Sequence, residues 1–274
     1  MLPAHRDVAE YLVGHAGVDK VTFTGSTEAG SRVMAACGPG ITRVTLELGG
    51  KSAALVLDDA DLDEHIGGLM MRMFANNGQV CTAQTRVLVS RARHDEVVGT
   101  LTTAIEAMRV GDPAEESTDL GPLIARRQRD RVEGFIAAGR EAGARVVTGG
   151  GRPGHLDRGW YVAPTLFVDV DNTMAIAQEE IFGPVVCVIA YDDVDHAVAL
   201  ANDSRYGLYG SVWTSDVEYG MQVARRVRVG NFSVNGAWGA ADAPFGGLKA
   251  SGFGRELGPA GLRAFVEEKS IHIA

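Results

Sequence analysis

The sequence predicts an α/β fold, and three observations support this prediction. Short apolar segments with the pattern of buried strands alternate with amphipathic helical segments along the chain. Hydrophobic residues make up 46 % and charged residues 22 % of the 274 residues, so a sizeable core can be buried. Glycine is abundant, at 35 residues, and its short clusters are typical of tight turns where the backbone approaches a ligand.

Composition and charge exclude several classes of partner and site. The formal net charge of −9 would repel nucleic acids and anionic membranes, and no apolar run is long enough to span a bilayer. No signal peptide is recognisable, so we expect a cytoplasmic protein without a nucleic-acid or membrane partner. The three cysteines, Cys37, Cys81 and Cys187, form no C-x-x-C pair, so neither a disulfide framework nor a metal site is predicted.

The first part of the chain predicts the order helix, strand, helix. Apolar residues at helical spacing predict a helix over residues 3–15, then a strand over 21–23 and a second helix around Met34. Gly25 and Ser26 stand where the second helix begins, and free N–H groups and the positive end of a helix dipole favour a phosphate there. A simple helix cap explains the same residues, so both interpretations stay open.

A carboxylate at the end of the next strand is a further candidate site residue. Residues 41–48 alternate as a strand does, and Glu47 ends this segment beside Gly49 and Gly50, before another strand over 53–57. Ligand and catalytic groups of open α/β sheets gather at the carboxyl ends of strands, although an ordinary surface glutamate fits the same pattern. The acidic run over 58–64 is interpreted as capping of the helix that follows.

Cys81 lies in the turn between that helix and a buried strand over residues 87–89. Gly78 and small polar neighbours would leave the thiol accessible and its backbone N–H free, as attack on a carbonyl requires. A buried and inert thiol is the alternative interpretation. Further along, Glu180 and Phe182 precede another strand, where they could hold ribose hydroxyls and a flat heterocycle or simply belong to the core.

The remaining segments continue the α/β order. Helices are predicted over residues 97–108 and 124–136, and the glycine-rich residues 149–159 form a hairpin or a crossover loop. The chain then predicts a strand over 185–189, a helix over 194–201, a strand over 212–213, a helix over 217–227 and a strand over 232–234. After a glycine-dense loop come a helix through Leu262 and Phe265 and a short edge strand over residues 271–273, suited to pairing with another subunit.

Five motifs in this order resemble the NAD(P)-dependent aldehyde dehydrogenase superfamily. They are Phe23 to Thr27, Leu46 to Ser52, Phe74 to Cys81, Glu180 to Val185 and Pro244 to Glu256. The resemblance covers essentially the whole chain, which corresponds to about the second half of a usual family member. It implies an aldehyde dehydrogenase-like fold with a truncated Rossmann-like remnant over 1–47, an open α/β catalytic domain over 48–255, and a C-terminal helix with an oligomerisation-type strand over 256–274.

The same resemblance implies a role for each candidate residue. Cys81 would be the nucleophile that forms a thioester with the substrate, and Glu47 the general base that activates water to hydrolyse it. Gly25 and Ser26 would lie near the phosphates of NAD or NADP. Glu180 and Phe182 would face the nicotinamide ribose and ring, with Gln128 and Arg131 also near the cofactor ribose.

The resemblance therefore implies oxidation of a small-molecule aldehyde to a carboxylic acid with NAD or NADP, by a protein whose full-length chain forms a homo-oligomer. In the family, an asparagine of the oxyanion hole and a lysine that contacts the adenosine ribose precede this segment, and so does part of the tunnel that selects the substrate. Neither the aldehyde nor the choice between NAD and NADP is therefore predicted. Two alternatives stay open. One is a catalytically incompetent fragment that acts as a structural or interaction module, and the other is a thioesterase or esterase that uses Cys81 and Glu47 without cofactor.

Overall fold

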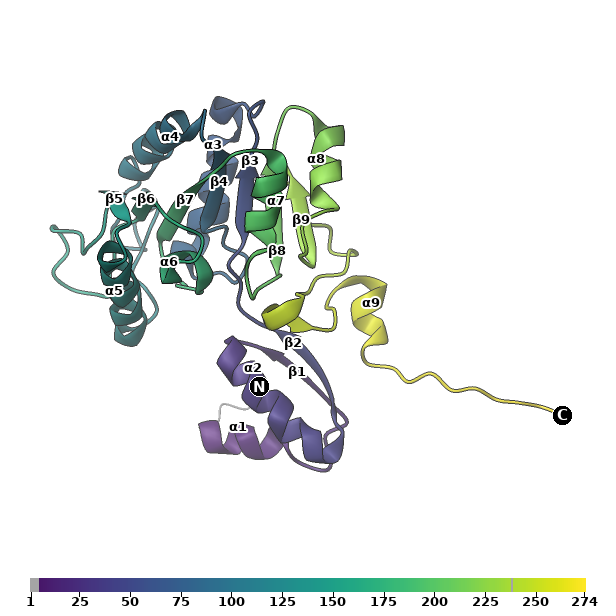
Figure 1. Ribbon diagram of the computed structural model, residues 1–274. Coiled ribbons are helices and arrows are strands. Elements are labelled where there is room, and N and C mark those ends of the chain that lie inside the picture. The colour runs from purple at the N-terminus through teal and green to yellow at the C-terminus, as the bar shows by residue number, and fades with distance from the viewer. Residues whose placement is uncertain (1–4, 238) are drawn as a thin grey trace.

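The computed structural model describes residues 5–237 and 239–274, which form two sheets and the helices around them (Figure 1). The larger sheet has seven strands within these residues, in the order β5-β6-β7-β4-β3-β8-β9, and every pair is parallel except β5 with β6. The predicted α/β class is confirmed. The strands are β3 (Ala53–Val56), β4 (Arg86–Ser90), β5 (Arg145–Thr148), β6 (Thr165–Val168), β7 (Val185–Tyr191), β8 (Tyr209–Trp213) and β9 (Asn231–Val234).

Helices cover both faces of this sheet, which explains why its strands are apolar on both sides. Ala54 and Val56 of β3 pack in one cluster with α3 (Leu62–Phe74) and α4 (His94–Glu106). Ala53 and Leu55 pack in a second cluster on the opposite face. The helices of that second face are α5 (Arg126–Glu141), α6 (Ala175–Gln178), α7 (Val194–Asn202) and α8 (Val217–Ala224).

The smaller sheet holds β1 (Lys20–Thr24), β2 (Arg43–Glu47) and β10 (Gly252–Phe253) in the order β1-β2-β10. Strands β1 and β2 are parallel, whereas β10 is antiparallel to β2 and pairs Gly252 with Glu47. Helices α1 (Arg6–Val13) and α2 (Thr27–Cys37) and the 3-10 turn η1 (Gly38–Gly40) belong to this unit, which lies below the larger sheet in Figure 1. The predicted boundary at residue 47 thus falls at the end of β2, but β10 joins this sheet from the far end of the chain.

The glycine-rich segment 149–159 connects an antiparallel pair, so the hairpin is the alternative observed. The second strand of this hairpin, β6, begins at Thr165. The first helix begins by Arg6, and the predicted residues 3 and 4 lie outside the described part of the chain. No helix in the described residues is long and apolar enough to cross a membrane.

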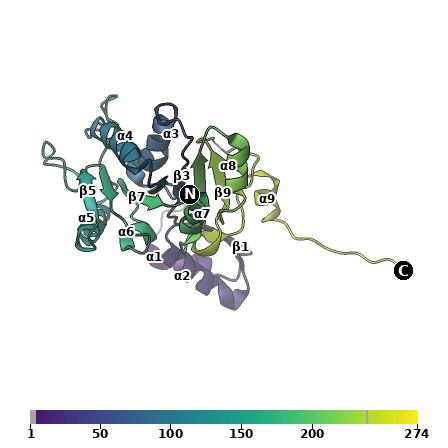
Figure 2. The same cartoon turned by 45° about the horizontal axis from the view of Figure 1, so that its top comes forward.

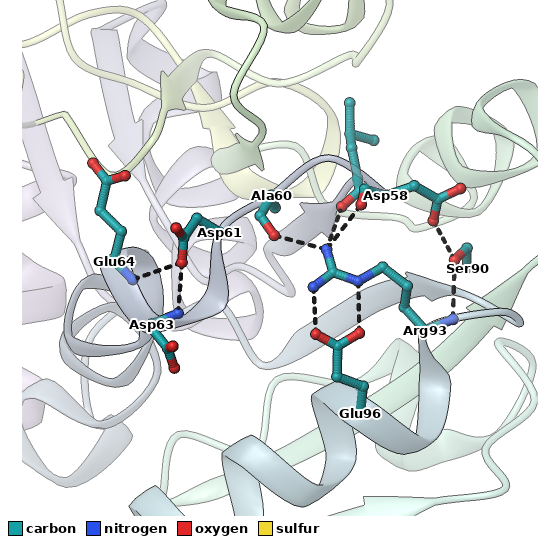
Figure 3. Close-up of polar contacts among 9 residues, drawn as sticks. Asp58, Ala60, Asp61, Asp63, Glu64, Ser90, Arg93 and Glu96 are labelled. Atoms are coloured by element: carbon teal, nitrogen blue, oxygen red, sulfur yellow. Dashed lines mark hydrogen bonds and ion pairs between the residues drawn. The ribbon is translucent and has the colours of Figure 1, made fainter.

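The acidic run over residues 58–64 has two structural roles, a helix cap and contacts with neighbouring loops (Figure 3). Asp61 caps α3 as predicted, because its carboxylate accepts hydrogen bonds from the N–H groups of Asp63 (3.0 Å) and Glu64 (3.1 Å). Capping is wrong for Asp58 and Asp59, which precede the cap and turn towards neighbouring loops. Their carboxylates accept hydrogen bonds from Ser90 on one side and from Thr214, Ser215 and Asp216 on the other.

The C-terminal region contains the helix α9 (Gly258–Arg263), which includes Leu262 as predicted but ends before Phe265. Residues 264–274 have no regular secondary structure and lead away from the body of the protein in both views (Figures 1 and 2). Ile271 and Ile273 are exposed. The strand predicted over 271–273 is not formed within this chain, because a strand needs a neighbour for its hydrogen bonds, and pairing with another subunit stays a prediction.

Candidate active site

A strained turn carries Cys81 from α3 to β4. The turn η2 (Ala75–Gly78) holds Asn76, Asn77 and Gly78 in the left-handed region, with φ of 50°, 60° and 69°. Asparagine and glycine tolerate this region better than other residues do. Gly78 is also required for space, because a Cβ atom there would lie 2.3 Å from the carbonyl oxygen of Gly183. The turn therefore packs directly against the segment that contains Glu180 and Phe182.

Side chains of the same turn hold it in place. The Asn77 amide donates to the carbonyl oxygens of Gly121 and Pro122, each at 3.0 Å. The Gln79 side-chain oxygen accepts a hydrogen bond from the N–H of Ile124 at 3.0 Å. Cys81 follows this anchored turn, in neither a helix nor a strand, and is half-buried. A nucleophile needs such a fixed position, since misplacement of the reacting atom is costly in rate.

The Cys81 thiol lies in a site with negative charge. Burial raises its pKa, and the carboxylates of Glu180 and Glu47 raise it further, whereas its own N–H and the N–H of Thr82 favour the thiolate. The thiol form is therefore favoured in this conformation. A base that removes the proton is needed before the sulfur can attack.

Glu47 ends β2 as a buried carboxylate. Its side chain is 4 % exposed, and neither of its oxygens has a hydrogen-bond partner among the described residues. Burial raises the pKa of Glu47 to about 7, the charge of Glu256 adds to this effect, and Arg255 opposes it. A carboxylate that titrates near neutral pH is suited to accept and release protons.

The turn at Gly25 joins β1 to α2. A Cβ atom on Gly25 would lie 2.6 Å from the ring of Phe23, so a larger residue there would have to displace this ring. The Ser26 hydroxyl caps α2 by accepting a hydrogen bond from the N–H of Ala29 at 3.2 Å. Because Thr27 and Glu28 are the first helical residues, their N–H groups have no acceptor within the helix. Capping and anion binding are thus compatible here.

Glu180 turns towards the strand end that carries Glu47. Its Oε1 accepts a hydrogen bond from the N–H of Gly50 at 3.1 Å, and a Cβ atom on Gly49 would lie 2.2 Å from Oε2. Burial raises the pKa of Glu180, while the Gly50 N–H, Arg131 and Lys51 lower it. Phe182 has a φ of 59°, which is uncommon for an aromatic residue and fixes where its ring points.

Gln128 and Arg131 project from α5 onto the backbone of this segment. Gln128 donates to the carbonyl oxygens of Ile181 (3.1 Å) and Phe182 (2.6 Å), and Arg131 donates to that of Glu180 (2.6 Å). Both side chains therefore hold the segment 180–182 in place. Direct contact with a cofactor ribose stays a prediction.

The structure brings all eight predicted site residues to one cleft, with a volume of about 1300 Å³. One wall comes from the β1–α2 turn and the end of β2, and the other from the Cys81 turn and the segment 179–182. The eight residues are Gly25, Ser26, Glu47, Cys81, Gln128, Arg131, Glu180 and Phe182. Among the described residues no group of three or more histidine, cysteine, aspartate or glutamate side chains is placed to hold a metal ion.

Three charged residues near the cleft received no role from the sequence. Lys51 is buried in the segment before β3, Arg86 is buried as the first residue of β4, and the charge of Glu256 acts on Glu47. A signal existed for the first two, because a lysine and an arginine beside apolar strand segments tend to be buried with them. The partners of Arg86 are distant in sequence and could not be predicted.

Comparison with known proteins assigns the chain to a family. A family model described as the aldehyde dehydrogenase family matches residues 1–271. The chain belongs to the aldehyde dehydrogenase family. It is 49 % identical over 272 residues to a geranial dehydrogenase of Castellaniella defragrans, a match that covers 99 % of this chain and 56 % of that relative.

Other relatives in the family differ in their named substrates. A betaine aldehyde dehydrogenase of Rhizobium leguminosarum bv. trifolii is 43 % identical over 276 residues, which is 100 % of this chain and 56 % of that protein. A solved aldehyde dehydrogenase of Mycobacterium tuberculosis, complexed with NAD+, matches with a TM-score of 0.97 and 46 % identity over 99 % of this chain and 56 % of that one. The chain thus spans 56 % of the length of these relatives.

Proposed function

We propose that this chain carries the catalytic residues of an NAD(P)-dependent aldehyde dehydrogenase, which oxidises an aldehyde to a carboxylic acid through a thioester on Cys81. The observation that carries the proposal is the shared cleft. It combines a cysteine on an anchored turn with Glu47, a buried carboxylate whose pKa is about 7. A thiol and a base that titrates near neutral pH are the groups that nucleophilic attack and hydrolysis require.

The cleft also fits a dinucleotide cofactor. The α2 N-terminus offers unpaired N–H groups beside Gly25 for a phosphate, and the anchored Glu180 and Phe182 offer a carboxylate and a ring at the other end. When bound, the nicotinamide supplies a hydride acceptor. The named relatives use different aldehydes, so the proposal extends to the aldehyde class and not to one substrate.

The residues of the chain divide the reaction into two stages. In the first, the Cys81 sulfur loses its proton to solvent, assisted by the backbone N–H groups of Cys81 and Thr82 that favour the thiolate, and then adds to the carbonyl carbon. Loss of hydride from this adduct leaves a thioester on Cys81. In the second stage Glu47 takes a proton from water, the hydroxide adds to the thioester carbonyl, and the Cys81 sulfur leaves.

The test is direct measurement of turnover. The purified chain, alone and within the longer protein that supplies the remaining length of its relatives, is mixed with NAD or NADP and short aldehydes. Absorbance of the reduced cofactor should rise, and the Cys81→Ser variant of the same protein should give no rise. No rise in either form of the wild-type protein would refute the proposal.

A second candidate is an interaction module without catalysis. Large apolar side chains exposed on α1, on α9 and in the segment after α9 favour contact with another chain, and they include Tyr11, Leu12, Leu262, Phe265 and Ile273. Under this hypothesis titration with NAD gives no saturable binding, and an alkylating reagent labels Cys81 at the rate of a free thiol. Saturable binding of NAD would reject it.

A further inference from the structure

The Glu47 carboxylate is buried, but no hydrogen bond among the described residues holds it. The backbone of Glu47 is fixed at the end of β2, because it pairs with Thr24 of β1 on one side and with Gly252 of β10 on the other. Both side-chain oxygens are buried and lack a hydrogen-bond partner within this part of the chain. A side chain without hydrogen bonds is positioned by its packing contacts, so the residues that touch this carboxylate decide where the proposed base lies.

The turn at Gly246 makes one of these contacts. Gly246 is buried, and a Cβ atom there would lie 2.7 Å from Oε1 of Glu47 and 2.7 Å from the carbonyl oxygen of Gly254. Nonbonded heavy atoms pack best at about 3.5 Å or more, so a side chain at position 246 would overlap with the carboxylate. The Glu47 carboxylate therefore occupies space that any residue other than glycine would fill.

Hydrogen bonds from three residues hold the Gly246 turn in place. Asn231, at the start of β9, donates from Nδ2 to the carbonyl oxygen of Gly246 at 3.1 Å. The residue before Gly246 exchanges two backbone hydrogen bonds with Glu256, at 2.8 and 2.7 Å. Arg255 donates from Nη1 to the carbonyl oxygen of the residue after Gly246 at 3.0 Å. Because the charges of Arg255 and Glu256 also act on Glu47, one segment provides both the packing and the charge around the base.

We infer that Gly246 is a positioning residue, whose lack of a side chain leaves the space in which the Glu47 carboxylate lies, and that Asn231 holds the Gly246 turn in this place. The inference rests on the proposed function, since it concerns how the general base of the second stage is held. A methyl group at position 246 should displace the carboxylate, because Oε1 ends a flexible side chain whereas the Gly254 oxygen belongs to the backbone. Hydrolysis of the thioester should then slow, while formation of the thioester, in which Glu47 takes no part, should continue.

The test separates the two stages by rapid acid quenching, in the form of the protein that turns over. The protein is mixed with NAD and an aldehyde, and the acyl group on Cys81 is followed by mass spectrometry together with the absorbance of the reduced cofactor. The variants are Gly246→Ala, Asn231→Ala and Glu47→Gln, with each of the first two also combined with Glu47→Gln. Gly99→Ala is the matched control, because Gly99 is exposed on α4 and has open space around it among the described residues. Circular dichroism and thermal melting show which variants are folded.

We expect Gly246→Ala to slow hydrolysis of the acyl group by about 10- to 100-fold, since a misplacement of 1 Å at a reacting group can be this costly. Asn231→Ala should slow it less, and Gly99→Ala should stay within about twofold of wild type. The first turnover should still release reduced cofactor in all of these variants. With Glu47→Gln already present, Gly246→Ala should change hydrolysis by less than about twofold, because the base that it displaces is absent.

The inference is overturned if folded Gly246→Ala hydrolyses its acyl group at the wild-type rate, or if the substitution slows hydrolysis equally with and without Glu47→Gln. If Gly246→Ala does not fold, the same comparison with Asn231→Ala decides. Crystal structures of the wild type and of a folded variant need no turnover, and an unmoved Glu47 carboxylate would also overturn the inference. Hydrolysis at the wild-type rate in Glu47→Gln alone would instead refute the base role of Glu47 in the proposed function, so the two failures are distinguishable.

Discussion

Two ionisable side chains, Arg86 and Glu47, are both buried but differ in their hydrogen bonds. Arg86 is 1 % exposed, and its guanidinium donates to the carbonyl oxygens of Lys51, Leu200 and Ala201 and to the Asn172 side chain. Glu47 is similarly buried, at 4 % exposure, yet neither oxygen has a partner among the described residues.

This difference in hydrogen bonding distinguishes a residue that stabilises the fold from a residue that is available to react. A buried charge whose nitrogen atoms all have acceptors connects parts of the fold, here β4 with the segment before β3 and with α7. A buried charge without partners destabilises the fold, and the oxygens of Glu47 are free to bond a reactant. Substitution of Arg86 should therefore cost stability, and substitution of Cys81 or Glu47 should cost activity.

The largest expected effect is that of Cys81→Ser. We predict a loss of aldehyde oxidation of about 10³-fold or more, because the hydroxyl of serine is a poor nucleophile in a site built around a thiol. The melting temperature should stay within a few degrees of wild type. Cys37→Ala is the matched control, since Cys37 is buried away from the cleft, and it should retain activity. Equal losses in both variants would contradict the assignment.

Glu47→Gln should lower steady-state turnover by about 10²- to 10⁴-fold, the usual contribution of a general base. In the wild-type protein the rate should rise with pH and level off above about pH 7, because Glu47 must be ionised to act. The variant should lack this rise of the rate with pH. If the rise persisted in Glu47→Gln, the titrating group would be another residue.

The same substitution should change stability in a pH-dependent way. Burial raises the Glu47 pKa from its ordinary 4.5 to about 7, so between these pH values the folded state holds a proton that the unfolded state has lost. The free energy of unfolding contributed by Glu47 therefore falls as pH rises through this window. Urea unfolding of wild type and Glu47→Gln should diverge from pH 4.5 to 7, with the variant the more stable at pH 7. Parallel curves would contradict the raised pKa.

Arg86→Met should destabilise the protein by about 3–5 kcal/mol, because it leaves several buried acceptors without a donor. Urea unfolding measures the loss, and turnover of the molecules that remain folded should change less than in Glu47→Gln. A loss of activity without a loss of stability would place Arg86 in the reaction and remove the contrast with Glu47.

The smallest effect is expected from the helix cap at Asp61. Asp61→Ala should cost about 1 kcal/mol of unfolding free energy, because two N–H groups of α3 lose their acceptor. Asp63→Asn changes the same helical turn without removing the cap and is the matched control. If both variants unfolded at the same urea concentration, the capping role would be wrong.

The sequence predicted the α/β class, most element positions and the residues that meet in the cleft, since order and local pattern carry that information. It could not predict what Gln128 and Arg131 do, because the carbonyl groups they bond lie about fifty residues away. The partners of Arg86 depend likewise on contacts with residues 172, 200 and 201 that only the folded protein defines. Asp58 and Asp59 were assigned to capping because their charge fits a helix start, whereas loop contacts decide where they point.

The central claim, a thioester on Cys81 that Glu47 helps to hydrolyse, is tested most directly by mass spectrometry of acid-quenched protein. Glu47→Gln, in the form of the protein that turns over, is mixed with NAD and an aldehyde and quenched within the first turnover. We predict about one equivalent of reduced cofactor per site and an equal amount of acyl group on Cys81, which decays slowly. Reduced cofactor without an acyl group on Cys81, or with the acyl group on another residue, would contradict the account.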